Sequence, residues 1–233
     1  MTKHAQLSLN VLLPDDETFA SFYAAQNQTV IDAVQACASG SGNPLLYLFG
    51  PQGAGRTHLL HAACAQATQA DRQASYIPLE KYAQLSPSIL DGLENLSLVC
   101  LDNIDAIAGE SVWEEAIFDL YNRIVEKRRA HLLVSGRQSP KHLGLALPDL
   151  ISRLDWSTNY KLAPLSDSEK LAAMQHRAHL RGFELTDEVG QFLLKRLSRD
   201  MRTLFETLDQ LDLASIEAKR KLTIPFVKSA LSL

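Results

Sequence analysis

Short apolar runs alternate with longer helix-like stretches over the first two thirds of the chain. The strand-sized runs lie in LLYLFG (45–50), ASYIPL (74–79), LSLVCLD (96–102), HLLVSG (131–136) and NYKLAP (159–164). Runs of this length separated by helical patterns predict βαβ units. We therefore expect residues 15–164 to form an α/β domain, with helices on both faces of a parallel five-stranded sheet.

After Pro164 the strand-like runs stop and four helices are predicted. Ser166 and Thr186 are expected to cap the first two helices, and the third and fourth are expected to begin near Asp200 and Thr223. Glu169 completes a capping box in the first helix, which we expect to end near Gly182, and Pro225 suits the first turn of the last one. Residues 165–233 are therefore expected to form a small all-α domain.

Composition and charge narrow the function classes. With 46% hydrophobic and 21% charged residues, the chain is neither disordered nor fibrous. No apolar run approaches the ~20 residues of a membrane helix, and the N-terminus lacks a signal-peptide pattern, so we expect a cytoplasmic protein. The net charge of −4 opposes direct, sequence-specific DNA binding. Three widely spaced cysteines indicate buried thiols.

One segment matches the phosphate-binding pattern GxxxxGK[ST] except that arginine replaces lysine. It consists of Gly50, Pro51, Gln52, Gly53, Ala54, Gly55, Arg56 and Thr57. Glycines let backbone amides converge on phosphates, and the helix predicted to follow, which begins near His58, adds its positive N-terminus. A strand precedes the segment, as the pattern requires. The sequence therefore predicts a nucleotide site that includes His58.

A carboxylate at the end of another strand supplies the second part of that site. Asp102 closes the apolar run LSLVCLD, and with the Thr57 hydroxyl it is expected to hold Mg²⁺ beside the nucleotide. Two substitutions predict slow hydrolysis. The side chain of Arg56 ends in a broad planar guanidinium, whereas the lysine of the usual pattern carries a compact charge. Asn103 occupies the position at which many such enzymes have a second acidic residue that polarises the attacking water. We expect a resident nucleoside diphosphate.

Segments along most of the chain resemble the DnaA branch of the AAA+ ATPases. They are TFASFYAAQN (18–27), GPQGAGRTHLLHA (50–62), VCLDNID (99–105), LPDLISRLDW (147–156) and RDMRTLFETLDQL (199–211). Taken in this order and spacing the match is highly specific. The resemblance implies an AAA+ αβα domain followed by a helical lid, and it implies that ADP or another adenine nucleotide binds with Mg²⁺.

The resemblance also implies roles for individual residues. Arg153 matches the arginine finger, which reaches the nucleotide of a neighbouring subunit; from the residues alone, a structural ion pair is the alternative. Arg202 matches the lid arginine that reaches over the phosphates. Phe19, Phe22 and Tyr23 match the segment near the base, although aromatic residues at this spacing also suit a core.

The chain departs from the initiator DnaA in three respects. Ser135, Gly136 and Arg137 stand where the initiator has an acidic sensor residue. We expect no helix-turn-helix domain after the lid. The third departure lies in residues 1–14, an expected tail, where Gln6, Leu7 and Leu9 resemble the motif that docks on the sliding clamp, the β subunit of DNA polymerase III. Such a peptide places its leucines in an apolar groove; an edge strand is the alternative.

The leading hypothesis is a negative regulator of bacterial replication initiation. Bound to the clamp, it would present Arg153 to ATP held by DnaA and stimulate hydrolysis there, with weak or absent hydrolysis of its own. The alternative is a self-sufficient AAA+ ATPase that loads or remodels a replication protein. A nucleic-acid-binding module is a third class, which the charge balance opposes. Self-association into a homo-oligomer is a further expectation.

Overall fold

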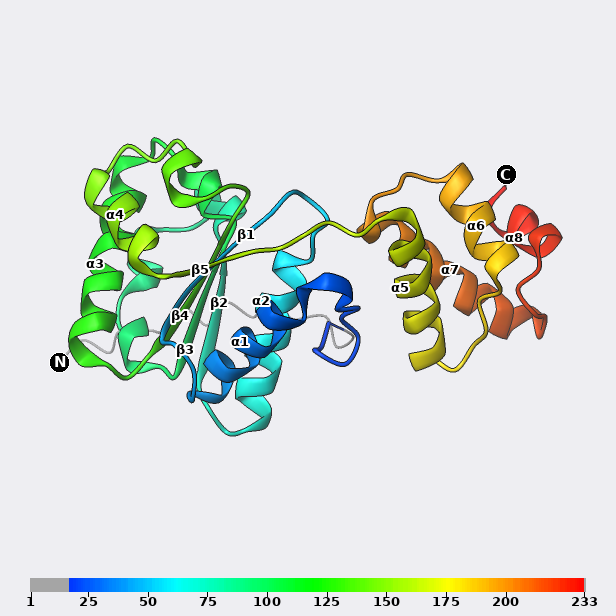
Figure 1. The fold of residues 1–233 in the computed structure, drawn as a ribbon, viewed down its shortest axis with the longest axis horizontal. Helices are drawn as coiled ribbons and strands as arrows, with labels where there is room; N and C mark the ends of the chain where they lie inside the picture. Colours follow the sequence, from blue (N-terminus) through cyan, green and yellow to red (C-terminus); the bar gives the residue numbers. More distant parts are fainter. Residues whose placement is uncertain (1–16, 233) are drawn as a thin grey trace. The chain divides into compact units, whose positions relative to one another are not determined.

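The computed structural model describes residues 17–232, which divide into two compact units (Figure 1). Among these residues, the first unit consists of 17–19 and Asn27–Ala163, and the second consists of Ala20–Gln26 and 164–232. The short segment Ala20–Gln26 thus groups with the C-terminal helices, whereas the sequence pattern places it with the α/β part. No helix in the described part of the chain is long and apolar enough to cross a membrane.

A parallel five-stranded sheet forms the centre of the first unit, as the sequence predicts. Its strands are β1 (Leu45–Phe49), β2 (Ala74–Pro78), β3 (Leu98–Asp102), β4 (His131–Gly136) and β5 (Thr158–Lys161). The spatial order is β2-β3-β4-β1-β5. Because all strands run the same way, the loops after β1, β3 and β4 meet at one edge of the sheet, where ligands bind in open α/β folds.

Helices cover both faces of the sheet (Figure 1). On one face lie α1 (Gln28–Ser39) and α2 (Arg56–Gln69), and on the other lie α3 (Ser111–Lys127) and α4 (Pro148–Trp156). Short 3-10 helices occur at Ala25–Asn27, Leu79–Gln84, Pro87–Leu90, Leu93–Asn95, Ile104–Ile107 and Pro140–His142. This αβα layering confirms the fold class that the sequence predicts.

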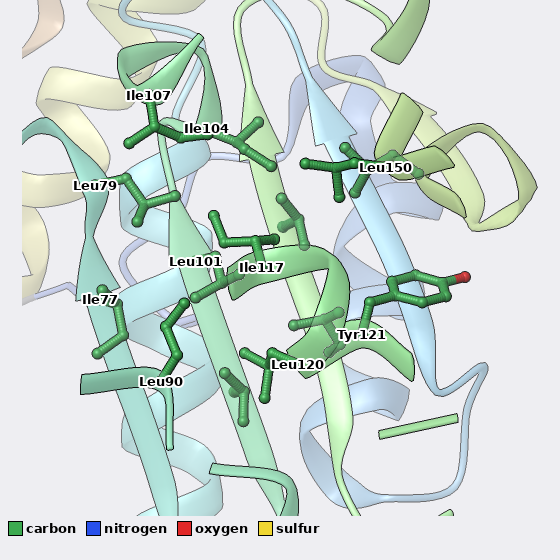
Figure 2. Packing of buried hydrophobic residues seen from close by; sticks show 14 of the residues in the cluster. Ile77, Leu79, Leu90, Leu101, Ile104, Ile107, Ile117, Leu120, Tyr121 and Leu150 are labelled. Carbon is green, nitrogen blue, oxygen red and sulfur yellow. The ribbon is translucent and has the colours of Figure 1, made fainter. Parts of the chain in front are cut away.

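One part of the core of the first unit lies between the sheet and α3 (Figure 2), and further buried apolar residues belong to α1 and α2. Leu101 of β3 and Ile117 and Leu120 of α3 are at most 1% exposed. Burying a side chain of this size stabilises the fold by roughly 1.5–3 kcal/mol. Cys37, Cys64 and Cys100 are free and buried, which confirms that they serve as small apolar residues.

The second unit is helical. It contains α5 (Asp167–Leu180), α6 (Asp187–Arg196), α7 (Met201–Ala218) and α8 (Ile224–Leu231). The N-caps predicted at Ser166 and Thr186 are confirmed, and Asp200 and Thr223 cap the other two helices, since each of these four side chains accepts a hydrogen bond from a backbone amide in the first turn. Ser166 and Glu169 form the predicted capping box. Gly182, just beyond α5, has a φ of 84°.

Candidate functional site

The phosphate-binding segment links the end of β1 to the start of α2. Gly53 and Gly55 have φ angles of 78° and 94°, which side chains disfavour. A Cβ atom on Gly50 would lie 2.7 Å from the carbonyl oxygen of Leu162, so no larger residue fits there. The helix begins at Arg56 with no acidic residue in its first turn. A glycine turn that leads into a helix N-terminus is an arrangement that holds phosphate groups.

The rest of this loop is open to solvent on one side. Pro51 and Gln52 are exposed, whereas Ala54 is buried and its amide donates to the carbonyl oxygen of Pro51 at 3.2 Å. Thr57 and His58 are half-buried on the first turn of α2. The loop is therefore accessible while its two ends are fixed by the sheet and the helix.

Arg56, at the lysine position of the motif, is buried and faces Asp105, three residues beyond β3. Its Nη1 atom lies 3.9 Å from Oδ1 of Asp105. Arg137, after β4, places Nε 3.0 Å from Oδ2 and donates its backbone N–H to Oδ1 at 2.9 Å. We call Asp105, Arg56 and Arg137 the Asp105 cluster. Two guanidinium groups around one carboxylate leave this cluster itself with a net positive charge.

The Asp105 cluster has unused capacity for an anion. Among the described residues, Nη1 of Arg56 has no hydrogen-bond acceptor although the atom is buried. Leaving a buried charged donor unpaired is costly, and a phosphate oxygen is an acceptor of the right charge. The sequence segment VCLDNID includes Asp105, but its partners lie in other loops, so its role is visible only in the fold.

Asp102, at the end of β3, is 1% exposed and accepts hydrogen bonds on both oxygens. Its Oδ2 accepts from the hydroxyls of Thr57 and Tyr76, each at 2.8 Å. Its Oδ1 accepts from the hydroxyl of Ser135, whose oxygen accepts from the amide of Asn103 at 3.0 Å. We call Asp102, Thr57, Tyr76 and Ser135 the Asp102 cluster. It joins the metal-binding pair expected from sequence to two residues that sequence reasoning did not assign.

Strand register brings the Asp102 cluster together. Ser135 of β4 pairs with Leu48 of β1, next to the phosphate loop, and Tyr76 of β2 pairs with Cys100 of β3. Burial, and then the nearby charge of Asp102, raise the pKa of the Tyr76 hydroxyl far above its usual value. The hydroxyl therefore stays protonated and remains a donor to Asp102.

Thr57 and Asp102 are the two residues that the sequence predicts for a magnesium ion that arrives with a nucleotide. In the described chain, no three His, Cys, Asp or Glu side chains form a metal-binding group. Thr57 offers one hydroxyl and Asp102 one carboxylate, and Mg²⁺ commonly binds one or two protein groups, waters and phosphate oxygens. An ion bound there would supply charge neutralisation at the phosphates, but Asp102 already accepts three hydrogen bonds from protein hydroxyls and has little capacity left to orient a hydration shell.

The aromatic residues expected near the base do not share one unit. Phe19 lies in the α/β unit, whereas Phe22 and Tyr23 belong to the segment that groups with the helical unit. Tyr23 packs against His176 there, with ring centroids 6.4 Å apart. In the α/β unit, Nε2 of His58 contacts the carbonyl oxygen of Thr18 at 2.9 Å. His58 therefore anchors the segment that leads into the α/β unit. Its contact with a bound nucleotide stays a prediction.

Arg153 lies on α4, half-buried, and its guanidinium has no ion-pair partner among residues 17–232. Its Cζ atom lies 5.7 Å from the ring centroid of Trp156, which is 76% exposed. On the same helix, Asp155 pairs with Lys141 at 2.9 Å. The structural ion pair considered for Arg153 is thus not formed in this part of the chain. Its planar guanidinium remains available to contact an external group.

Glu114 of α3 fixes the start of α4 and was not anticipated from the sequence. Its carboxylate is fully buried and accepts from the backbone amides of Gly109 at 2.8 Å, Ala146 at 2.8 Å and Leu147 at 2.6 Å. Leu147 is the residue directly before α4. An isolated glutamate in an amphipathic helix gives no signal of this role, because the two partners next to α4 lie 32 and 33 residues away.

The remaining predicted residues lie elsewhere. Arg202 is exposed in the first turn of α7, in the helical unit. Gln6, Leu7 and Leu9 lie outside the described residues. Their roles stay predictions.

Comparison with known proteins gives two family matches. A model of the bacterial DnaA ATPase domain matches residues 13–161, and a model described as "Hda, lid domain" matches residues 167–231. The two matches cover most of the chain and meet near the end of β5.

Solved structures of similar fold include replication initiators. Domain III of Thermotoga maritima DnaA has a TM-score of 0.79 at 20% identity, covering 94% of this chain and 97% of that one. AMPPCP-bound DnaA from Aquifex aeolicus has a TM-score of 0.70 at 18% identity, covering 88% and 68%. The Thermotoga maritima RuvB branch-migration motor has a TM-score of 0.65 at 15% identity, covering 92% and 73%.

Proposed function

Because this chain belongs to the DnaA-related AAA+ family, with an ATPase domain of the bacterial DnaA type and a lid of the Hda type, we propose that it is a negative regulator of replication initiation. It holds an adenine nucleotide in its phosphate loop. It presents Arg153 to ATP that is bound by the initiator DnaA, and so promotes hydrolysis in the partner's site.

The observation that carries this proposal is that the guanidinium of Arg153 is not engaged by a carboxylate within the described residues. An arginine that acts in trans needs a guanidinium free of internal carboxylates, and Arg153 forms no ion pair within the described residues. It also needs a rigid support, which Glu114 gives by fixing the chain before α4. The exposed ring of Trp156 beside it offers apolar area for a partner to cover. An arginine so placed can neutralise charge on a transferring phosphoryl group.

The chain's own site supports binding better than turnover. Asp102 is occupied by three hydroxyl donors, and Asn103 offers an amide where a carboxylate would polarise water. Arg137, after β4, is engaged by Asp105. These features support a resident diphosphate, expected to be ADP, and slow or absent hydrolysis by the isolated chain.

This expectation distinguishes the regulator from a self-sufficient loading or remodelling ATPase. We expect the isolated chain to bind ADP at least as tightly as ATP and to release phosphate far more slowly than ~10 s⁻¹, a typical enzyme turnover. Titration with both nucleotides and steady-state phosphate release measure this. Adding ATP-loaded initiator and clamp should start hydrolysis. Clearly tighter binding of ATP, or turnover near the typical value by the chain alone, would favour the remodelling ATPase.

We further propose that the N-terminal tail docks on the sliding clamp through Gln6, Leu7 and Leu9. Replacing Leu7 and Leu9 together by Ala should abolish clamp binding in surface plasmon resonance, because the two leucines supply the apolar contact of an extended peptide. The melting temperature should not change. Replacing Leu12 and Leu13 by Ala is the matched control and should leave binding intact. Unchanged clamp affinity after deletion of residues 1–9 would show that the motif is incidental.

A further inference from the structure

The carboxylate of Asp102 has little acceptor capacity left for a metal-bound water. A carboxylate offers about four lone-pair positions. Three are used by hydroxyl donors, with Thr57 and Tyr76 on Oδ2 and Ser135 on Oδ1. Asp102 is also only 1% exposed, so the surrounding protein leaves its carboxylate no room to rotate toward an ion.

Of the three hydroxyl donors to Asp102, Tyr76 is the one that comes from outside the loops at the edge of the sheet where the nucleotide is expected. It projects from β2, and its ring is held against His61 of α2, edge to face, with centroids 4.4 Å apart. His61 in turn contacts the carboxylate of Glu17 through Nδ1. A ring held by His61, which is itself anchored by Glu17, keeps its hydroxyl on Asp102 whether or not a ligand is present.

We propose that Tyr76 is a positioning residue that occupies Asp102 and so makes nucleotide binding by this chain nearly independent of Mg²⁺. The inference rests on the nucleotide-binding function proposed above and deepens it. Where a free carboxylate would hold the ion's hydration shell, this one already accepts three hydrogen bonds from protein hydroxyls. The phosphates are then held by the glycine turn, by the N-terminus of α2 and by the positive charge of the Asp105 cluster.

The test compares ADP affinity in Mg²⁺ with ADP affinity in EDTA, using a fluorescent ADP analogue. For the unmodified chain we expect the two dissociation constants to agree within about 3-fold. For Tyr76→Phe we expect binding to be about 10-fold tighter in Mg²⁺ than in EDTA. The lost hydroxyl frees one acceptor position for a metal-bound water, and a hydrogen bond to a charged group has about this effect.

Two further variants separate this role from a structural one. Tyr82→Phe removes a tyrosine hydroxyl that donates to Glu110 at 3.3 Å, away from the phosphate loop, and should behave as the unmodified chain. Adding Asp102→Asn to Tyr76→Phe should remove the new Mg²⁺ dependence, because the effect requires the carboxylate. A tyrosine that only stabilises the fold would lower the melting temperature without changing the ratio of the two affinities.

The outcomes are distinct. An Mg²⁺ dependence of more than about 3-fold in the unmodified chain overturns the inference without any variant, so the test holds even if Tyr76→Phe fails to fold. A folded Tyr76→Phe protein with an unchanged affinity ratio overturns it as well. If the unmodified chain binds no ADP in either medium, the nucleotide-binding proposal falls and this inference falls with it.

Discussion

Arg153→Ala is expected to leave a folded, nucleotide-bound protein that has lost nearly all its stimulation of ATP hydrolysis by the initiator. An arginine supplied in trans contributes roughly 10³–10⁵ in rate by neutralising charge in the transition state. Because Arg153 forms no ion pair within the described residues and contacts mainly the face of Trp156, the cost in stability should be at most about 1 kcal/mol. Phosphate release from ATP-loaded initiator and thermal melting measure both effects.

Two further variants sharpen this result. Arg153→Lys keeps the charge and loses the planar fork, so it should be strongly impaired. Arg129→Ala removes an exposed arginine of the same unit and should stimulate normally. Full stimulation by Arg153→Ala would contradict the assigned role. A structural arginine would instead lower the melting temperature together with the activity.

Glu114→Ala is expected to destabilise the α/β unit by roughly 3–5 kcal/mol. The substitution removes a buried carboxylate and leaves the backbone amides of Gly109, Ala146 and Leu147 without their acceptor, at about 1–3 kcal/mol each. The melting temperature should fall by on the order of 10 °C. Calorimetry measures the change.

The neighbouring glutamate provides a matched control. Glu115 is exposed on the same helix, so Glu115→Ala should cost less than about 0.5 kcal/mol. Glu114→Gln keeps one acceptor oxygen and should fall between the two. Equal stability of the Glu114→Ala and Glu115→Ala proteins would show that the carboxylate does not anchor α4.

Features that depend on neighbouring residues in the sequence were predictable. The glycine turn at residues 50–57, the sheet strands and the N-caps of the lid helices each depend on a few adjacent residues, whose backbone preferences act locally. The pairing of Ser166 with Glu169 is one such case, since both partners lie within one helical turn. Resemblance to a family added the candidate role of Arg153, which a lone arginine in a short helix does not indicate.

Features that depend on strand register or on long-range contacts were not predictable. Tyr76 and Ser135 reach Asp102 from 26 and 33 residues away, and only the order of strands in the sheet brings them together. The ion pair between Arg137 and Asp105 likewise joins two separate loops. The segment Ala20–Gln26 groups with the helical unit because of tertiary contacts that its sequence pattern does not specify.

The central claim is that Arg153 acts on a nucleotide held by another protein. The most direct measurement loads the initiator with labelled ATP and this chain with unlabelled ADP, adds clamp on DNA, and follows the label in a single turnover. The account predicts that label on the initiator is converted to ADP while this chain keeps its own unlabelled ADP, and that conversion stops with Arg153→Ala. Conversion that requires labelled ATP to move to this chain first, or that proceeds unchanged with Arg153→Ala, would contradict it.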